Sequence, residues 1–358
     1  LEAKSPLSLV FAIPDHPWVD SADGAQVRIA MTVGTAGKLE GLLLKVLDEQ
    51  NSDTDEIYVN FQSHQGMLFA DLKIGANVVA SRSLQANLGI SQRGFELGNA
   101  GFIVSHSEAI TLGLDVIPSV SRHIKDYRNG KDLTDQPRGV MVIDLFGLGE
   151  DEVRTQYPAI YQWLLERVKP EREHNRDPRL QRQWWLHRRS RDDLRKMIAS
   201  VFRFVATVET MKHRVFQFID TKILPDNKLV NIAIDDAHAL GVLSSRVHII
   251  WALATGSRLG VGNDSVYVKT TCFETFPFPD ATPDQQTRIR ALAEQLDAHR
   301  KRQQAEHSGL TLTGMYNVLE KLRSGEKLND KEKLIHQQGL VSILRELHDQ
   351  LDRAVFAA

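Results

Sequence analysis

The sequence of 358 residues holds a single cysteine, Cys272, and has no apolar run long enough to span a membrane. One cysteine excludes a disulfide framework and a cysteine-based zinc site within one chain, and it favours a reducing, cytoplasmic setting. No secretory signal opens the chain, so we expect no membrane association. The start Leu1-Glu2-Ala3-Lys4 lacks an initiator methionine, which we interpret as the start of a piece of a longer protein.

Known catalytic patterns are missing as well. The sequence has no His-Glu-x-x-His pair and no Walker loop, and the glycines near residues 256–262 do not lie between a strand and a helix as a dinucleotide fingerprint requires. A metal-dependent nuclease needs at least two converging carboxylates beside a lysine. Residues 225–228 (PDNK) are better explained as a tight turn, and Asp235-Asp236 as a helix N-cap. We therefore expect no catalytic residue, metal site or cofactor in this chain.

The charge is small overall but unevenly distributed. The net charge of −2 excludes a uniformly basic nucleic-acid binder. Residues 167–214, however, hold 14 Lys/Arg against 6 Asp/Glu, a local balance of +8. This asymmetry indicates a side that faces a polyanion. A solvated helical face with Arg–Glu pairs explains it equally well, and both interpretations stay open at this point.

The most informative segment is 243–279. An apolar helical pattern passes into a polar loop rich in glycine, and the loop ends in the rigid run Phe276-Pro277-Phe278-Pro279. Such a segment presents hydrogen-bonding side chains at the end of a packed scaffold. It contains neither a nucleophile with a base nor a metal-ligand cluster, so it favours recognition of a polar surface over chemistry.

Apolar periodicity predicts an α+β fold: a mixed α/β domain followed by an all-α C-terminal module. Residues 35–56 are predicted as a surface connection. A helix should begin at Thr282 and Pro283, and Leu340, Leu344, Leu347 and Leu351 form a seam like that of a coiled coil. The other predicted elements are strands at 7–13, 27–33, 57–61, 102–104, 140–146, 215–220 and 229–234, and helices at 150–170, 191–211 and 236–254.

Several runs along nearly the whole chain make a recognisable pattern: 11–18 (FAIPDHPW), 27–30 (VRIA), 87–91 (NLGIS), 101–104 (GFIV), 124–133 (IKDYRNGKDL), 138–144 (RGVMVID), 167–172 (RVKPER) and Trp184-Trp185. Together they resemble the C-terminal half of large bacterial adenine-specific DNA methyltransferases, including fused restriction–modification enzymes of the MmeI type. In that family a target-recognition domain and then helices follow the catalytic core. The resemblance implies that residues 1–50 are the tail of the methyltransferase core and a connector, 51–280 the recognition domain, and 281–358 the helical module.

The resemblance also implies double-stranded DNA as partner, together with an upstream methyltransferase domain of the same chain. The parent enzyme would use S-adenosylmethionine, whose glycine motif and Asn/Asp-Pro-Pro-aromatic motif are missing here. Polar loop residues are the candidates for contact with base edges: Arg258, Asn263, Asp264, Ser265, Tyr267, Lys269 and Thr270. Basic residues are the candidates for phosphate contact: Arg128, Lys131, Arg182, Arg188, Arg189, Arg191, Lys212 and Arg214.

Two alternatives remain beside DNA recognition. The C-terminal helices could make the chain an interaction scaffold that pairs with another subunit. A metal-dependent nuclease or hydrolase is the third hypothesis, with the weakest support from the residues.

Overall fold

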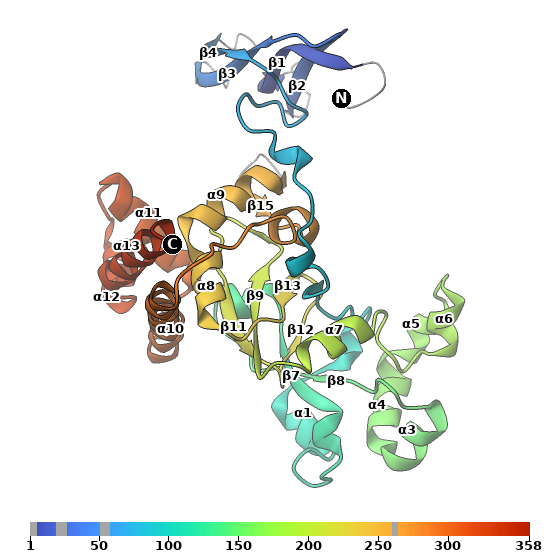
Figure 1. The fold of residues 1–358 in the computed structure, drawn as a ribbon. Coiled ribbons are helices and arrows are strands. Elements are labelled where there is room, and N and C mark those ends of the chain that lie inside the picture. Colours follow the sequence, from blue (N-terminus) through green and yellow to red (C-terminus); the bar gives the residue numbers. More distant parts are fainter. Residues whose placement is uncertain (1–5, 19–26, 51–57, 260–263) are drawn as a thin grey trace. The chain divides into compact units, whose positions relative to one another are not determined.

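The computed structural model describes residues 6–18, 27–50, 58–259 and 264–358 (Figure 1). The chain divides into two compact units, Leu1–Arg82 and Ser83–Ala358. The boundary predicted at residue 50 differs from this division, because it would separate two paired strands of one sheet. Strands and helices together confirm the predicted α+β class.

The N-terminal unit is a four-stranded sheet in the order β2-β1-β3-β4. Its strands are β1 (Leu7–Trp18), β2 (Val27–Ala36), β3 (Gly41–Gln50) and β4 (Tyr58–Gly66). β3 lies in the segment predicted as a surface connection, so that prediction is wrong. Residues 42–47 are apolar except for Lys45, and Leu43 among them packs with Ala12 and Leu68 in a small core, which favours a strand.

The second unit contains two four-stranded sheets and one of three strands. The first sheet has the order β11 (Gln217–Asp220), β9 (Arg203–Val208), β13 (Leu229–Ile232) and β5 (Ser91–Arg93). The second has the order β12 (Leu224–Pro225), β7 (Ile124–Arg128), β8 (Met141–Ile143) and β6 (Ile103–Val104). The third has the order β10 (Thr210–Met211), β15 (Asp264–Val266) and β14 (Ser257–Leu259).

A second prediction is wrong. The helix expected at 191–211 ends at Ile198, and the strand β9 follows within the same range. Residues 204–207 are all buried, and β9 pairs on one side with β11 and on the other with β13. A strand covered on both faces shows no apolar–polar alternation, and such a run cannot be told from a buried helix by period alone.

Short helices surround these sheets. They are α1 (His106–Thr111), α2 (Gly130–Thr134), α3 (Glu150–Gln156), α4 (Pro158–Arg167), α5 (Lys169–Glu173), α6 (Pro178–Arg182) and α7 (Asp192–Ile198). The single helix predicted at 150–170 is thus broken, with Pro158 and Pro170 each in the first turn of a new helix. Trp184 and Trp185 are buried in the core formed by these helices and the sheets.

Two apolar helices, α8 (Ala237–Ser244) and α9 (Arg246–Thr255), connect the sheets to the C-terminal module. Within the described residues no single helix is long and apolar enough to cross a membrane, although α8 and α9 together meet that test while bent by 62°. The predicted all-α module consists of α10 (Pro283–Glu306), α11 (Leu312–Ser324), α12 (Asp330–Gln338) and α13 (Val341–Phe356), gathered beside α8 in Figure 1. As predicted, Thr282 caps α10, and it does so reciprocally with Gln285.

Gly241 allows α8 to pack closely on the C-terminal module. A Cβ at this position would lie 2.6 Å from the Cγ2 of Ile289 on α10 and 3.2 Å from a methyl of Leu351 on α13. A larger residue would therefore force apart two helices whose contact joins the module to the sheets.

We predict that Gly241→Ala destabilises the chain by about 1–3 kcal/mol through overpacking. In an open helix the same change would stabilise by about 1 kcal/mol, so the sign distinguishes close packing from helix propensity. Urea unfolding measures the difference. Gly309→Ala is the control, because nothing lies within 4 Å of its added Cβ. Equal stability of the two variants would contradict the packing argument.

Candidate nucleic-acid interface

The hairpin β14–β15 carries the loop singled out in the sequence. Arg258 pairs through its backbone with Ser265, and Asp264 begins β15 with an exposed side chain. Asn263 lies outside the described residues, as does the side chain of Arg258. Thr270 is exposed on the helical turn Lys269–Phe273 that follows. At the start of β15, Asp264 therefore presents a polar side chain that is open to a ligand.

Three other candidates for base contact have partners within the chain. Tyr267 is 1% exposed, and its hydroxyl lies 2.9 Å from Nε2 of the buried His248. Burial lowers the pKa of His248 to about 3 and raises the pKa of Tyr267 well above its usual value, so both side chains are neutral near pH 7. Ser265 is buried and donates to the carbonyl of Met211, while Lys269 forms an ion pair with Glu274 at 2.9 Å.

The phosphate contact predicted for Arg214 does not fit the structure, because the side chain of this arginine is buried. The guanidinium donates to the carbonyl and the hydroxyl of Ser265 at 2.8 and 3.0 Å. It also donates to the carbonyl of Val208 and to Oγ1 of Thr207, and it lies over the ring of Tyr267. Burial lowers the pKa of Arg214 to about 10. This arginine joins β9 to β15 and so fixes the hairpin on the main sheet.

Three further phosphate candidates surround Glu96, which follows β5. Nη1 of Arg188 lies 3.0 Å from Oε1 of Glu96, and Nε of Arg189 lies 3.1 Å from Oε2. Arg191 adopts a left-handed backbone with φ of 47° and donates to the carbonyl of Gly94 at 3.1 Å. All three side chains contact Gly94 or Glu96, directly after β5.

Two cations that the sequence analysis missed extend this group. Arg93 at the end of β5 and Lys228 before β13 both form ion pairs with Glu209, the latter at 3.4 Å. We call the five cations Arg93, Arg188, Arg189, Arg191 and Lys228 the basic ridge. No local sequence signal identifies Arg93 or Lys228, because their neighbourhood depends on strand pairing across more than a hundred residues.

The basic ridge and the hairpin meet at Glu209. Its backbone N–H donates to the carbonyl of Lys228 at 2.8 Å, and its carbonyl accepts from the N–H of Tyr267 at 2.7 Å. Glu209 therefore lies between β9 and β10, next to the ridge on one side and next to the hairpin on the other. The structure thus brings together the arginine-rich segment and the polar loop that lay far apart in the sequence.

The remaining phosphate candidates lie outside the ridge. Lys131 is exposed on α2, Arg182 is exposed at the end of α6, and half-buried Arg128 lines a groove of about 540 Å³ beside α10. Among the described residues none of these three forms an ion pair. Lys212 pairs with Glu320 of α11 at 3.2 Å, which turns this lysine toward the helical module.

The acids considered for metal binding have other partners. Asp236 caps α8 and pairs with Arg290 at 2.7 Å, which confirms the predicted N-cap. Asp226 accepts from the N–H of Lys228 and from the hydroxyl of Tyr127, which confirms the predicted turn. Within the part of the chain that the structure describes, no group of three or more metal-ligating side chains occurs.

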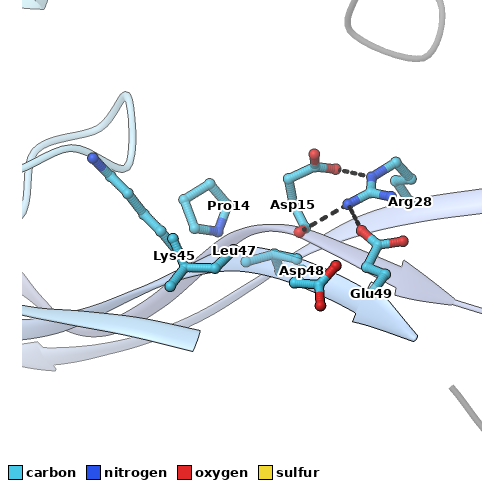
Figure 2. A pocket seen from close by; sticks show the side chains of 8 residues that line it. Pro14, Asp15, Arg28, Lys45, Leu47, Asp48 and Glu49 are labelled. Atoms are coloured by element: carbon cyan, nitrogen blue, oxygen red, sulfur yellow. Dashed lines mark hydrogen bonds and ion pairs between the residues drawn. The ribbon is translucent and has the colours of Figure 1, made fainter. Parts of the chain in front are cut away.

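The N-terminal unit has its own small groove of about 390 Å³, shown in Figure 2. Arg28 occupies one end, where its guanidinium lies 2.5 Å from Oδ1 of Asp15 and 2.6 Å from Oε1 of Glu49. These two carboxylates raise the pKa of Arg28 above its usual value. Because two acids compensate this cation, the groove offers less attraction to a polyanion than the ridge does.

The second unit is thus an α+β domain that carries a group of cations beside a polar hairpin and is packed against a helical module. Residues 95–280 match the family model of the MmeI target recognition domain, and the chain belongs to this family. The fold resembles that of the type IIL restriction–modification enzyme MmeI, solved in complex with DNA, with a TM-score of 0.67 and 17% identity. That likeness covers 98% of this chain but 43% of MmeI, so the chain spans less than half of that protein.

A second solved structure, the type IIG restriction endonuclease BpuSI, matches with 10% identity over 98% of this chain and 44% of that one. Its TM-score of 0.32 is too low to support an argument. No curated protein matches the chain.

The position of the ridge depends on a buried ion pair. Arg195 of α7 donates to both oxygens of Asp144 at 2.8 and 2.7 Å and to the carbonyl of Ser190 at 2.9 Å. Ser190 lies between Arg189 and Arg191, so this pair anchors the arginine segment to the end of β8. Despite its burial, the bond from Arg195 holds the pKa of Asp144 at about 2.

We predict that this pair makes stability dependent on pH below about 4. The pKa of Asp144 is lower in the folded than in the unfolded chain, so its contribution is present above about pH 4 and is lost as pH falls toward 2. The difference in pKa corresponds to about 2 kcal/mol. Asp144→Asn should unfold more easily at pH 7, by about 3 kcal/mol, and lose less stability between pH 5 and 2.

Urea unfolding at several pH values measures both effects. Asp330→Asn, at an exposed position on α12, serves as the control and should follow the wild-type profile. An Asp144→Asn profile parallel to that of the wild type would contradict the role assigned to the pair.

Proposed function

We propose that this chain recognises a specific sequence in double-stranded DNA and forms the specificity part of a DNA-modifying enzyme of the restriction–modification class. The observation that carries the proposal is the junction of a five-cation ridge with a polar hairpin, in a chain of the target recognition domain family. Cations position a protein on phosphates, whereas side chains that reach base edges select sequence.

The geometry suits the ridge to phosphate contact and the hairpin to contact with base edges. The ridge residues Arg188 and Arg189 expose more than half of their side chains, which suits phosphate contact. The described part of the hairpin is small, since β14 and β15 are three residues each, and Asp264 begins β15 with an exposed side chain that suits contact with a base edge. Asp264, Arg258 and Asn263 on this hairpin are the residues proposed to reach base edges. Thr270 is a further candidate on the turn that follows.

We propose further that the catalytic part lies elsewhere in the parent protein, as an adenine methyltransferase domain that uses S-adenosylmethionine. MmeI is more than twice as long as this chain, which leaves room for such a domain in a parent of similar length. The chain lacks the glycine motif and the Asn/Asp-Pro-Pro-aromatic motif, so its residues do not fit the cofactor. A cytoplasmic location belongs to the same proposal.

One observation supports the alternative hypothesis that the chain is an interaction scaffold. α9 exposes Val247, Ile250 and Leu253 along one face, at 40%, 61% and 40%. Such a face is typical of a surface that packs on another protein segment. Failure of the following two predictions together would favour this alternative.

Removal of ridge charge should weaken binding to every duplex. We predict that Arg188→Gln/Arg189→Gln lowers the affinity for a random duplex roughly tenfold and makes the slope of log K against log salt shallower by about 1.8, or 0.9 per lost phosphate contact. Fluorescence anisotropy across a potassium chloride series measures both quantities.

The matched control is Arg323→Gln/Arg353→Gln, which removes the same charge from α11 and α13. An equal loss in control and ridge variants would show only a net-charge effect and would contradict a phosphate role for the ridge.

Hairpin variants should instead lose selectivity. We predict that Arg258→Ala or Asp264→Ala lowers the preference for a duplex selected from a random library by about tenfold, with less effect on random duplexes. Competition binding gives the preference ratio. Arg345→Ala, exposed on α13, is the control. Unchanged ratios in both hairpin variants would remove the hairpin from sequence recognition.

A further inference from the structure

We propose that Glu96 and Glu209 are specificity-determining residues that suppress non-specific DNA binding, because each carboxylate holds two cations of the basic ridge. The inference rests on the proposed function and deepens it. It assigns a role in recognition to two acids on a surface that would otherwise bind any duplex through its charge.

Backbone hydrogen bonds hold Glu96 beside Arg189. The N–H of Arg189 donates to the carbonyl of Glu96 at 3.0 Å, and the N–H of Glu96 donates back at 3.4 Å. This two-way pairing keeps the carboxylate beside both arginines, at 3.0 and 3.1 Å. The side chain of Glu96 is 23% exposed, against 54% for Arg188 and 61% for Arg189. The acid therefore lies beneath the two cations that a phosphate would approach.

Glu209 repeats this arrangement at the other end of the ridge. Its side chain is 8% exposed, while those of Arg93 and Lys228 are 48% and 68% exposed. The two cations come from β5 and from the turn before β13, and both reach the same carboxylate. In both places one acid pairs with two cations that are more exposed than it is, so each group keeps a net charge of +1.

Non-specific affinity depends on the number of phosphates that free cations neutralise, because each contact releases condensed counterions. A cation shared with a glutamate attracts a phosphate less, since the glutamate already satisfies part of its charge and its hydrogen bonds. The pairs with Glu96 are partly exposed and cost little to rearrange, so they weaken phosphate contact without preventing it.

The specific complex is affected differently. Its base contacts add favourable energy and fix the position of the duplex, so it depends less on the free charge of the ridge. Half-compensated cations therefore lower the affinity for random sequence more than the affinity for the recognised site. The ratio of the two affinities, which is the specificity, rises as a result.

Glu96→Gln tests this proposal, since it keeps the size of the side chain and one acceptor oxygen while removing the charge. For the whole chain, we expect the affinity for a random duplex at 100 mM salt to rise about 3–10-fold, with a salt slope steeper by about 1. The affinity for the selected duplex should rise less, so that the preference ratio falls about threefold or more.

Glu346→Gln on α13 is the matched control, because it removes an equal charge from an ion pair outside the ridge. Glu96→Gln/Arg189→Gln restores the ridge charge and should return random-duplex affinity to within about twofold of the wild type. An unchanged or reduced random-duplex affinity in Glu96→Gln would overturn the proposal. An increase no larger than that of Glu346→Gln would do the same, as would an equal increase for the selected duplex.

These outcomes are distinct from failure of the proposed function itself. If the wild-type chain shows no salt-dependent duplex binding, DNA recognition fails as a whole. If the wild type binds and Glu96→Gln behaves like its control, only the role of the glutamates fails. A thermal unfolding midpoint within a few degrees of the wild type shows that Glu96→Gln remains folded.

Discussion

The surface described here depends on Glu209, whose backbone and side chain connect four strands. Its N–H and carbonyl bond to Lys228 and Tyr267, and its carboxylate pairs with Arg93 and Lys228. Residues in β5 and directly beside β9, β13 and β15 therefore meet at Glu209. Because a buried carboxylate is costly unless it is paired, this acid also fixes where the two cations lie. The location of the basic ridge thus follows from satisfying one buried charge.

Buried arginines organise the same region from within. Arg214 donates hydrogen bonds to carbonyl and hydroxyl oxygens of β9 and β15, and Arg195 donates to Asp144 and Ser190. A planar guanidinium with five N–H groups can bond several backbone carbonyls at once, which a lysine ammonium does in a less fixed geometry. The arginine-rich composition therefore serves two purposes here: some arginines hold the recognition elements in place, and others face solvent.

The sequence allowed the fold class and the C-terminal helices to be predicted, since Thr282, Pro283 and the leucine seam are local signals. β9 could not be predicted, because burial on both faces removes the alternation that marks a strand. For the site, residues in the segments 188–191 and 257–266 were predicted to contact DNA, yet the charge pattern alone gave Arg214 and Arg188 the same role. Their difference depends on burial set by distant strands, as do the partners Glu96 and Glu209. Only three-dimensional packing separates a structural arginine from a surface one.

Amide hydrogen exchange, measured with and without a duplex carrying the selected sequence, is the most direct test of this surface. We expect slower exchange in the bound state at residues 91–96, 188–191 and 257–266, with α11, α12 and α13 unchanged. These segments are far apart in the sequence and are joined through Glu96 and Glu209, so their joint protection would be specific to this surface. Protection confined to the helical module or to the N-terminal sheet would contradict it.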